Sequence, residues 1–306
     1  MTLTPRLALL MSLPPLLWAG NAVIGRLLVG HVAPLSLNAL RWALALLVLL
    51  PLGWRAVATR AARRQIVERW RELALLGLLG VGSYNALQYL ALQTSSPINV
   101  TLIAASAPLW MLGVGATFYG VRPTWRELAG AAFSLAGVAI VLARGELARL
   151  AQVAFVRGDL LMMAAIIAWS IYSWMLSRPP PRLAGARRPD WNWAQFLLVQ
   201  TLFGCTFAGA AAGVEALVLP TAPVRWSPSI VAAVVFIALG PSVIAYRCWG
   251  IGVAAAGPAT AAFFSNLTPL FAALLSAALL GEAPQPYHGL AFALIVAGIA
   301  VSSRRR

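Results

Sequence analysis

The chain has 306 residues, of which 61% are hydrophobic and 10% are charged, and its mean hydropathy is +0.82. A water-soluble domain needs a much larger polar share, so this composition excludes an ordinary soluble protein. The net charge of +15 comes from 23 basic residues, all of them Arg, and most stand in short runs between apolar segments. That is the pattern of membrane topology determinants, so we expect no nucleic-acid partner.

Apolar segments long enough to cross a bilayer, which takes about 20 residues each, recur along the whole chain. They are continuous rather than alternately apolar and polar, which argues against a transmembrane barrel. The first follows Arg6 and resembles a signal peptide, but its length and the lack of a small-x-small cleavage site favour an uncleaved helix. We predict an all-α integral membrane protein with ten transmembrane helices, near residues 7–29, 34–53, 73–93, 97–119, 126–143, 158–177, 193–218, 229–251, 258–280 and 286–303.

Three polar segments interrupt these spans. Residues 54–71 form a loop with six Arg, and residues 146–157 are mildly amphipathic, which predicts a connector lying along the membrane interface. Residues 178–190 are basic and rich in Pro, so we expect an extended, mobile linker. The predicted domains are two five-helix units, 1–145 and 158–306.

The distribution of Arg tests the number of helices. With the N-terminus in the cytoplasm and ten alternating helices, 16 Arg fall in cytoplasmic segments and 4 outside, while Arg26, Arg41 and Arg247 lie within spans. Positively charged residues concentrate in cytoplasmic loops. The bias therefore predicts ten helices with both termini in the cytoplasm.

Two stretches of the chain repeat each other. The stretch PINVTLIAASAPLW begins at Pro97 and PATAAFFSNLTPLF begins 161 residues later; the same offset pairs Pro108 with Pro269, Gly120 with Gly281, Pro123 with Pro284 and Gly137 with Gly298. Because Pro and Gly set backbone shape, these pairs indicate two copies of one structure. Five spans per copy is an odd number, so the second copy must insert upside down. Inverted repeats place the solute site in a central cavity near the membrane midplane.

Several short motifs carry a family resemblance. They are Trp-Ala-Gly-Asn (18–21), Leu-Arg-Trp (40–42), Ala-Pro-Leu (107–109), Thr-Pro-Leu (268–270) and Gly-Glu followed by Pro (281–284). In this order the whole chain resembles the drug/metabolite transporter superfamily, in particular its ten-helix EamA-type exporters. The many Trp and Tyr inside the spans are similar to those of the aromatic amino-acid exporters of the YddG type. The resemblance implies a transporter of the bacterial inner membrane that works as a monomer, with a small-molecule solute as partner and no cofactor.

Polar and aromatic residues inside the spans are the candidate solute-binding residues. Tyr84 and Gln88 stand four residues apart in the third span, and Tyr246 and Trp249 share a face of the eighth. The 161-residue offset maps Gln88 onto Trp249, so these faces occupy equivalent places in the two copies. To this site we also assign Trp18, Asn21, Ser106, Trp110, Trp169, Tyr172 and Asn266. The alternatives are a hydrogen-bonded seam between helices and, for the Trp residues, contact with lipid.

Two prolines and one arginine complete the prediction. Pro108 and Pro269 lie near the middles of their spans, where each removes a backbone donor and predicts a kink, either a gating hinge or a static bend. Arg41 is the most deeply placed charge. It is expected either to line the cavity or to tie its helix to a backbone carbonyl.

The positions of the acidic residues bear on how transport is driven. All eight fall in loops or at span ends, as do both His. Proton-coupled antiporters keep an ionisable carboxylate or His within the membrane. We therefore hypothesise facilitated diffusion or exchange. If transport proves proton-driven, Glu72, Asp159 and His288 are the candidate proton carriers.

The sequence thus predicts an exporter of small neutral or zwitterionic metabolites, aromatic amino acids and methionine above all. A proton-coupled exporter of drugs, purines or other metabolites is one alternative, and a receptor or scaffold, which the inverted repeat argues against, is another. The spans hold no metal-binding cluster or catalytic Ser/His or Asp pair, and the chain has no ATP-binding G-x-x-x-x-G-K-[ST] motif, so we expect neither an enzyme nor an ATP-driven pump.

Overall fold

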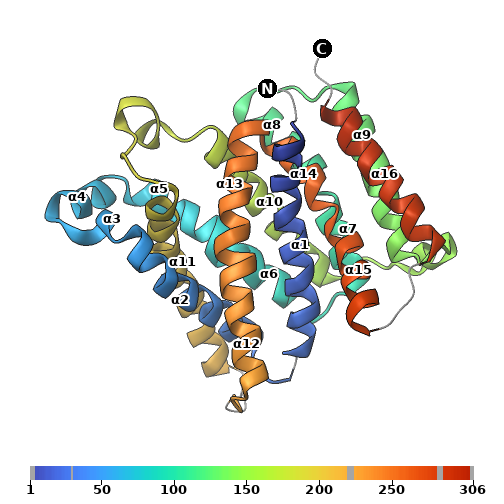
Figure 1. Ribbon diagram of the computed structural model, residues 1–306, viewed down its shortest axis with the longest axis horizontal. Coiled ribbons are helices and arrows are strands. Elements are labelled where there is room, and N and C mark those ends of the chain that lie inside the picture. Colours follow the sequence, from blue (N-terminus) through green and yellow to red (C-terminus); the bar gives the residue numbers. More distant parts are fainter. Residues whose placement is uncertain (1–3, 29, 219–223, 281–284, 304–306) are drawn as a thin grey trace.

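The computed structural model describes residues 4–28, 30–218, 224–280 and 285–303, and all regular structure in these ranges is helical (Figure 1). The first half contains α1 (Pro5–Leu27), α2 (Pro34–Gly53), α3 (Arg55–Ala58), α4 (Arg60–Glu68), α5 (Trp70–Leu76), η1 (Gly77–Ser83), α6 (Tyr84–Ala91), α7 (Pro97–Ala105), α8 (Ala107–Tyr119) and α9 (Trp125–Leu142). The second contains η2 (Leu147–Gln152), α10 (Arg157–Ser177), η3 (Pro181–Leu183), η4 (Gly185–Arg187), α11 (Trp193–Val218), α12 (Pro228–Ile237), η5 (Ala238–Ile244), α13 (Ala245–Ala256), α14 (Pro258–Ser265), α15 (Thr268–Leu280) and α16 (Pro286–Ser303). The Gly-Glu motif at 281–284 and the three C-terminal Arg lie outside the described residues.

Each predicted span coincides with one helix or with a consecutive run of helices. In the described part of the chain, eight helices are long and apolar enough to cross a membrane, and α7 with α8 forms a ninth, bent by 47°. The remaining predicted span is α1, a helix of 23 residues that packs against α13 and α15. The all-α membrane fold is confirmed.

Three elements of the first copy have the same bounds as their counterparts in the second copy. The 161-residue offset carries α8 onto α15 and α9 onto α16, and it carries η1 onto η5. Both η1 and η5 are π-helical, a feature that hydropathy does not reveal. A π-turn inserts one residue into an α-helix and is frequent at functional sites, because it releases a backbone carbonyl from the helical ladder.

Pro108 and Pro269 also stand in equivalent places, each at the second position of the helix that follows a break. Pro fits the first turn of a helix, where its missing N–H has no partner to lose. In the first copy the break at Ser106 separates α7 from α8 and accounts for the 47° bend. The predicted kink is present there, and its role as a hinge stays a prediction.

Equivalent helices of the two copies pack against each other and run antiparallel. A Cβ on Gly130 of α9 would lie 2.7 Å from the carbonyl oxygen of Gly298 of α16, and one on Gly137 would lie 2.8 Å from that of Ala291. The 161-residue offset maps position 130 onto 291 and position 137 onto 298, so the two contacts are equivalent when the copies are exchanged. Such reciprocal contacts define a two-fold relation. Because α9 and α16 both span the membrane, their antiparallel packing shows that the two copies are inverted.

The pair α2 and α11 repeats this arrangement on the other side of the bundle (Figure 1). The last residue of α2, Gly53, lies against Ala194 and Leu198 near the start of α11, while Leu35 near the start of α2 hydrogen-bonds Glu215 near the end of α11. These two helices are therefore also antiparallel.

The Pro-rich segment 178–190 is not extended, so that prediction was wrong. It contains the short helices η3 and η4, and the side chain of Leu183 is only 3% exposed. Arg69 donates hydrogen bonds to the carbonyl oxygens of Arg182 and Arg187 at 3.0 and 2.8 Å, and Arg182 lies 3.8 Å from Glu72. The basic segment 54–71 is likewise helical in α3 and α4, and the two segments pack together at one end of the bundle.

Candidate functional site

Six of the predicted site residues form one aromatic cluster: Trp18, Tyr84, Trp169, Tyr172, Tyr246 and Trp249. Trp169 of α10 is its centre, with ring centroids 5.6 Å from Trp18, 5.4 Å from Tyr84, 5.1 Å from Tyr172, 5.4 Å from Tyr246 and 5.2 Å from Trp249. Helices α1 and α6 of the first copy and α10 and α13 of the second supply these rings. The aromatic cluster therefore lies where the two copies meet, as the inverted repeat predicts for a solute site.

Two polar atoms of the aromatic cluster hydrogen-bond to the two π-helical segments, while Trp249 Nε1 donates to Ser173 Oγ. The Tyr246 hydroxyl donates a hydrogen bond to the carbonyl oxygen of Gly80 in η1, and Trp18 Nε1 donates one to the carbonyl oxygen of Pro241 in η5 at 3.2 Å. The 161-residue offset maps Gly80 onto Pro241. Equivalent carbonyls in the two copies thus accept hydrogen bonds from rings of the cluster, and each bond crosses from one copy to the other.

Arg41 is buried beside the aromatic cluster, with 1% of its surface exposed. Its Nε and Nη2 donate to Ser242 Oγ at 3.0 and 2.9 Å, and its Nη1 donates to Asn85 Oδ1 at 3.0 Å. The guanidinium carbon also lies 5.5 Å from the ring of Trp42, which stacks edge-on against Tyr246 at 4.9 Å. Arg41 is thus held by two side chains rather than by the backbone carbonyl that the sequence suggested.

Three predicted residues make other contacts. Asn266 Nδ2 donates to the carbonyl oxygen of Ala105 at 3.0 Å and to Ser134 Oγ at 2.8 Å. Ala105 and Asn266 are equivalent under the offset, so this bond lies on the two-fold axis and braces the two helix breaks. Trp110 Nε1 donates to Ser106 Oγ within α7–α8 at 3.1 Å. These contacts do not join Asn266, Ser106 or Trp110 to the aromatic cluster.

Two further predicted residues, Asn21 and Gln88, lie on helices of the aromatic cluster, α1 and α6. Asn21 Oδ1 is buried without a hydrogen-bond partner, and Gln88 is half-buried. The prediction omitted Asn38 and Trp42, both on the buried face of α2 with Arg41. Their spacing could have revealed them, because positions 38, 41, 42 and 45 face one way on a helix.

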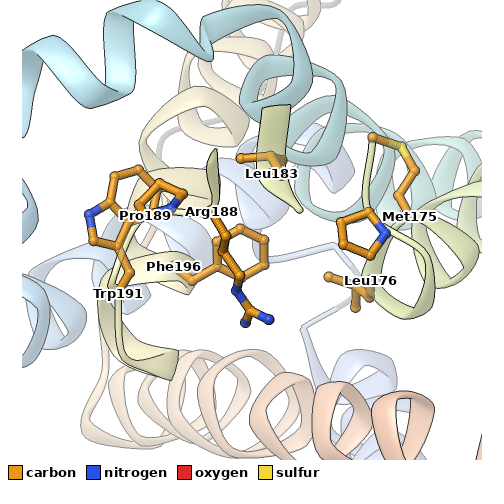
Figure 2. A pocket seen from close by; sticks show the side chains of 8 residues that line it. Met175, Leu176, Leu183, Arg188, Pro189, Trp191 and Phe196 are labelled. Carbon is orange, nitrogen blue, oxygen red and sulfur yellow. The ribbon is translucent and has the colours of Figure 1, made fainter. Parts of the chain in front are cut away.

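The packed rings leave little space in this conformation. Trp169, Tyr172, Tyr246 and Trp249 are between 2 and 6% exposed. A separate cavity of about 40 Å³ lies at the end of α10, between that helix and segment 178–190 (Figure 2). It is lined mainly by Met175, Leu176, Pro179, Leu183, Arg188, Pro189, Trp191 and Phe196, and it is large enough for water but not for an amino acid. Trp18 and Tyr84 are half-buried, so the cluster is closely packed around Trp169 and partly exposed at these two rings.

The two buried carboxylates among the described residues, those of Asp159 and Glu215, accept hydrogen bonds at the starts of helices. Asp159, 1% exposed, accepts hydrogen bonds from Ser95 Oγ, from Asn99 Nδ2 and from the backbone N–H of Val156 at the start of α10. Glu215, 5% exposed, accepts from the N–H groups of Leu35 and Ser36 at 3.0 and 2.8 Å at the start of α2. Neither lies in the middle of a span. Among the described residues no group of three or more His, Cys, Asp or Glu could hold a metal ion, and Cys205 and Cys248 are free thiols.

Glu215→Gln is expected to lower the free energy of unfolding by about 1 kcal/mol, because bonds from α2 N–H groups to a charged acceptor become bonds to a neutral one. Thermal unfolding of the purified protein in detergent measures the change. Glu146→Gln is the control, since Glu146 pairs with Arg149 on the exposed surface and should show no measurable shift. Equal melting temperatures for the two variants would contradict the capping role.

Comparison with known proteins agrees with this architecture. The model of the EamA-like transporter family matches twice, over residues 6–143 and 156–304. The chain is 27% identical over 280 residues to the aromatic amino acid exporter YddG of Ancylobacter novellus, covering 90% of this chain and 89% of the relative. It is 28% identical over 241 residues to a probable terminal-alkyne amino-acid exporter of Streptantibioticus cattleyicolor, covering 78% of this chain and 75% of the relative.

A crystal structure with 27% sequence identity to this chain superposes on it with a TM-score of 0.75, and the match covers 97% of this chain and 96% of the solved chain. This solved structure therefore shares the fold of the chain along almost the whole length. The two family matches fall on the two inverted copies that the structure shows. The chain belongs to the EamA-like transporter family.

Proposed function

We propose that this protein exports small zwitterionic metabolites, aromatic amino acids and methionine above all, across a bacterial inner membrane by alternating access. The supporting observation is the aromatic cluster, in which Trp169 of the second copy contacts rings from both copies. Aromatic and thioether side chains bind aromatic rings through stacking and sulfur contacts. The two relatives named as amino-acid exporters support the same solute class.

The inverted copies provide the transport mechanism. Each copy contributes rings to the aromatic cluster, so tilting one copy against the other would open it first to one side of the membrane and then to the other. The hydrogen bonds of Tyr246 to Gly80 and of Trp18 to Pro241 cross between the copies. They would have to break and form again in each cycle. Because both copies are in one chain, the proposed working unit is a monomer with both termini in the cytoplasm.

The contacts of the buried carboxylates bear on whether transport is driven by protons. The described carboxylates that are buried, Asp159 and Glu215, are held by several donors at helix ends. A proton-carrying group must release its partners and face the transport path in turn. We therefore favour a facilitator or exchanger. A proton-coupled exporter is the second candidate, because both carboxylates are buried.

Flux into liposomes that contain the purified protein tests the proposal. Tryptophan, phenylalanine, methionine and a neutral drug are each supplied with and without an imposed pH gradient. The expected result is saturable amino-acid flux that the gradient does not change. Accumulation of solute against its own gradient while protons flow would refute the facilitator. Single neutral substitutions at Glu72, Asp159, Glu215 and His288 would then identify the proton carrier. Drug flux without amino-acid flux would refute the solute class.

A further inference from the structure

Arg41 carries a full positive charge in the interior of the protein without a matching negative charge. None of the ion pairs in the described part of the chain includes Arg41, and its hydrogen-bond acceptors, Ser242 and Asn85, are neutral. Burying a charge without a counter-ion is costly, and intramembrane Arg residues mark functional sites for this reason. Glu215 of α11 lies against the start of α2, but its carboxylate oxygens accept hydrogen bonds from the N–H groups of Leu35 and Ser36.

Unpaired polar atoms gather on the same face of α2. In the described residues eight buried side-chain atoms lack a hydrogen-bond partner, and three of them belong to Asn38 and Trp42. Asn38 is 1% exposed and Trp42 is fully buried. Native proteins pair nearly all such atoms, so an Asn with both amide atoms unpaired one helical turn from a buried Arg indicates a polar binding site.

The chemistry of these atoms specifies the ligand. Asn38 Nδ2 and Trp42 Nε1 are unpaired donors, and the guanidinium of Arg41 has five N–H groups but makes three hydrogen bonds. A carboxylate is an acceptor only, and it is the planar anion that an Arg side chain binds best. The unpaired Asn38 Oδ1 is an acceptor suited to an ammonium group.

The position of Arg41 connects this chemistry to the aromatic cluster. Its acceptor Asn85 directly follows Tyr84, and its acceptor Ser242 stands four residues before Tyr246, one helical turn away. Trp42 contacts the ring of Tyr246. A solute with a carboxylate at Arg41 would therefore place its side chain against the rings of the cluster.

We propose that Arg41 is the carboxylate-binding residue of the transport site, assisted by Asn38 and Trp42, with Asn85 and Ser242 holding the guanidinium when no solute is bound. This inference rests on the proposed function and adds the chemical group that selects the solute. It assigns to α2, which supplies no ring to the aromatic cluster as defined, the recognition of the α-carboxylate.

Ligand binding to the purified full-length protein tests the proposal. L-tryptophan, tryptamine, which lacks the carboxylate, and indole-3-propionate, which lacks the amino group, compete with radiolabelled tryptophan. The wild-type protein is expected to bind tryptophan about 10- to 100-fold more tightly than tryptamine, the range for a lost hydrogen bond to a charged group. Arg41→Gln should remove this preference, and Arg41→Lys should keep part of it.

Arg247→Gln is the matched control, because Arg247 also lies within a span but is exposed and stacks on Trp193 at 4.4 Å. It should retain the preference for tryptophan. If the Arg41 variants do not fold, the comparison of the three ligands on the wild-type protein still decides the question. Equal binding of tryptophan and tryptamine, or an unchanged preference in a folded Arg41→Gln, overturns the proposal.

The outcomes also separate this inference from the function on which it rests. Tryptophan flux with no preference over tryptamine would leave the amino-acid exporter standing and remove Arg41 from recognition. Direct binding of radiolabelled indole-3-propionate that depends on Arg41, without binding of any amino acid, would keep the carboxylate site and replace the solute class. If none of the three ligands binds, the carboxylate site fails, and the liposome flux of phenylalanine and methionine decides the solute class.

Discussion

Trp169→Ala is expected to abolish saturable amino-acid flux and to lower the free energy of unfolding by about 3–5 kcal/mol, the cost of removing a large aromatic side chain from a packed core. Trp169 is 6% exposed and contacts five other rings, so its loss leaves a cavity that the neighbouring helices cannot fill without moving. Flux into liposomes and thermal unfolding in detergent measure the two effects.

Trp169→Phe separates binding from stability. It keeps an aromatic face for the solute and most of the packing, so it should fold and retain part of the flux. Trp226→Ala is the control, since the side chain of Trp226 is 56% exposed and should change neither quantity. Full flux through a folded Trp169→Ala would show that the aromatic cluster is a packing feature and not the transport site.

Gly298→Leu is expected to lower the free energy of unfolding by about 3 kcal/mol or more, the upper range for overpacking. A Cβ at this position would lie 2.6 Å from the carbonyl oxygen of Gly130 and 3.0 Å from the backbone N of Ser134. Backbone atoms cannot turn aside as a side chain can, so α9 and α16 would have to separate. Loss of the folded fraction on size-exclusion chromatography and a lower melting temperature report the damage.

Gly289→Leu on the same helix is the matched control. A Cβ there meets nothing within 4 Å, and leucine is a better helix former than glycine, so this variant should be as stable as the wild type or slightly more stable. Because the contacts are reciprocal, Gly130→Leu should be as damaging as Gly298→Leu. A stable Gly298→Leu would mean that α9 and α16 do not pack as described.

The sequence alone determined the membrane class, the spans and the repeat, because each follows from properties of consecutive residues. Twenty apolar residues in a row can satisfy their backbone groups in lipid only as a helix. Equal spacing of Pro and Gly, as in Pro108 with Pro269, fixed the offset that carries α8 onto α15 and α9 onto α16. The odd number of spans per copy then required the inversion that the antiparallel α9 and α16 show.

Only the tertiary structure decided which faces of the helices meet. In a soluble protein the apolar face of a helix marks its buried side, but in a membrane the lipid-facing side is apolar too, so hydropathy gives no orientation. The sequence therefore placed Asn266 and Trp110 in the candidate site beside Trp169, whereas the structure puts Asn266 on the two-fold axis and bonds Trp110 within its own span. The π-helical segments and the hydrogen-bond partners of Arg41 could not be predicted either, because both depend on how a helix is rotated and wound rather than on its composition.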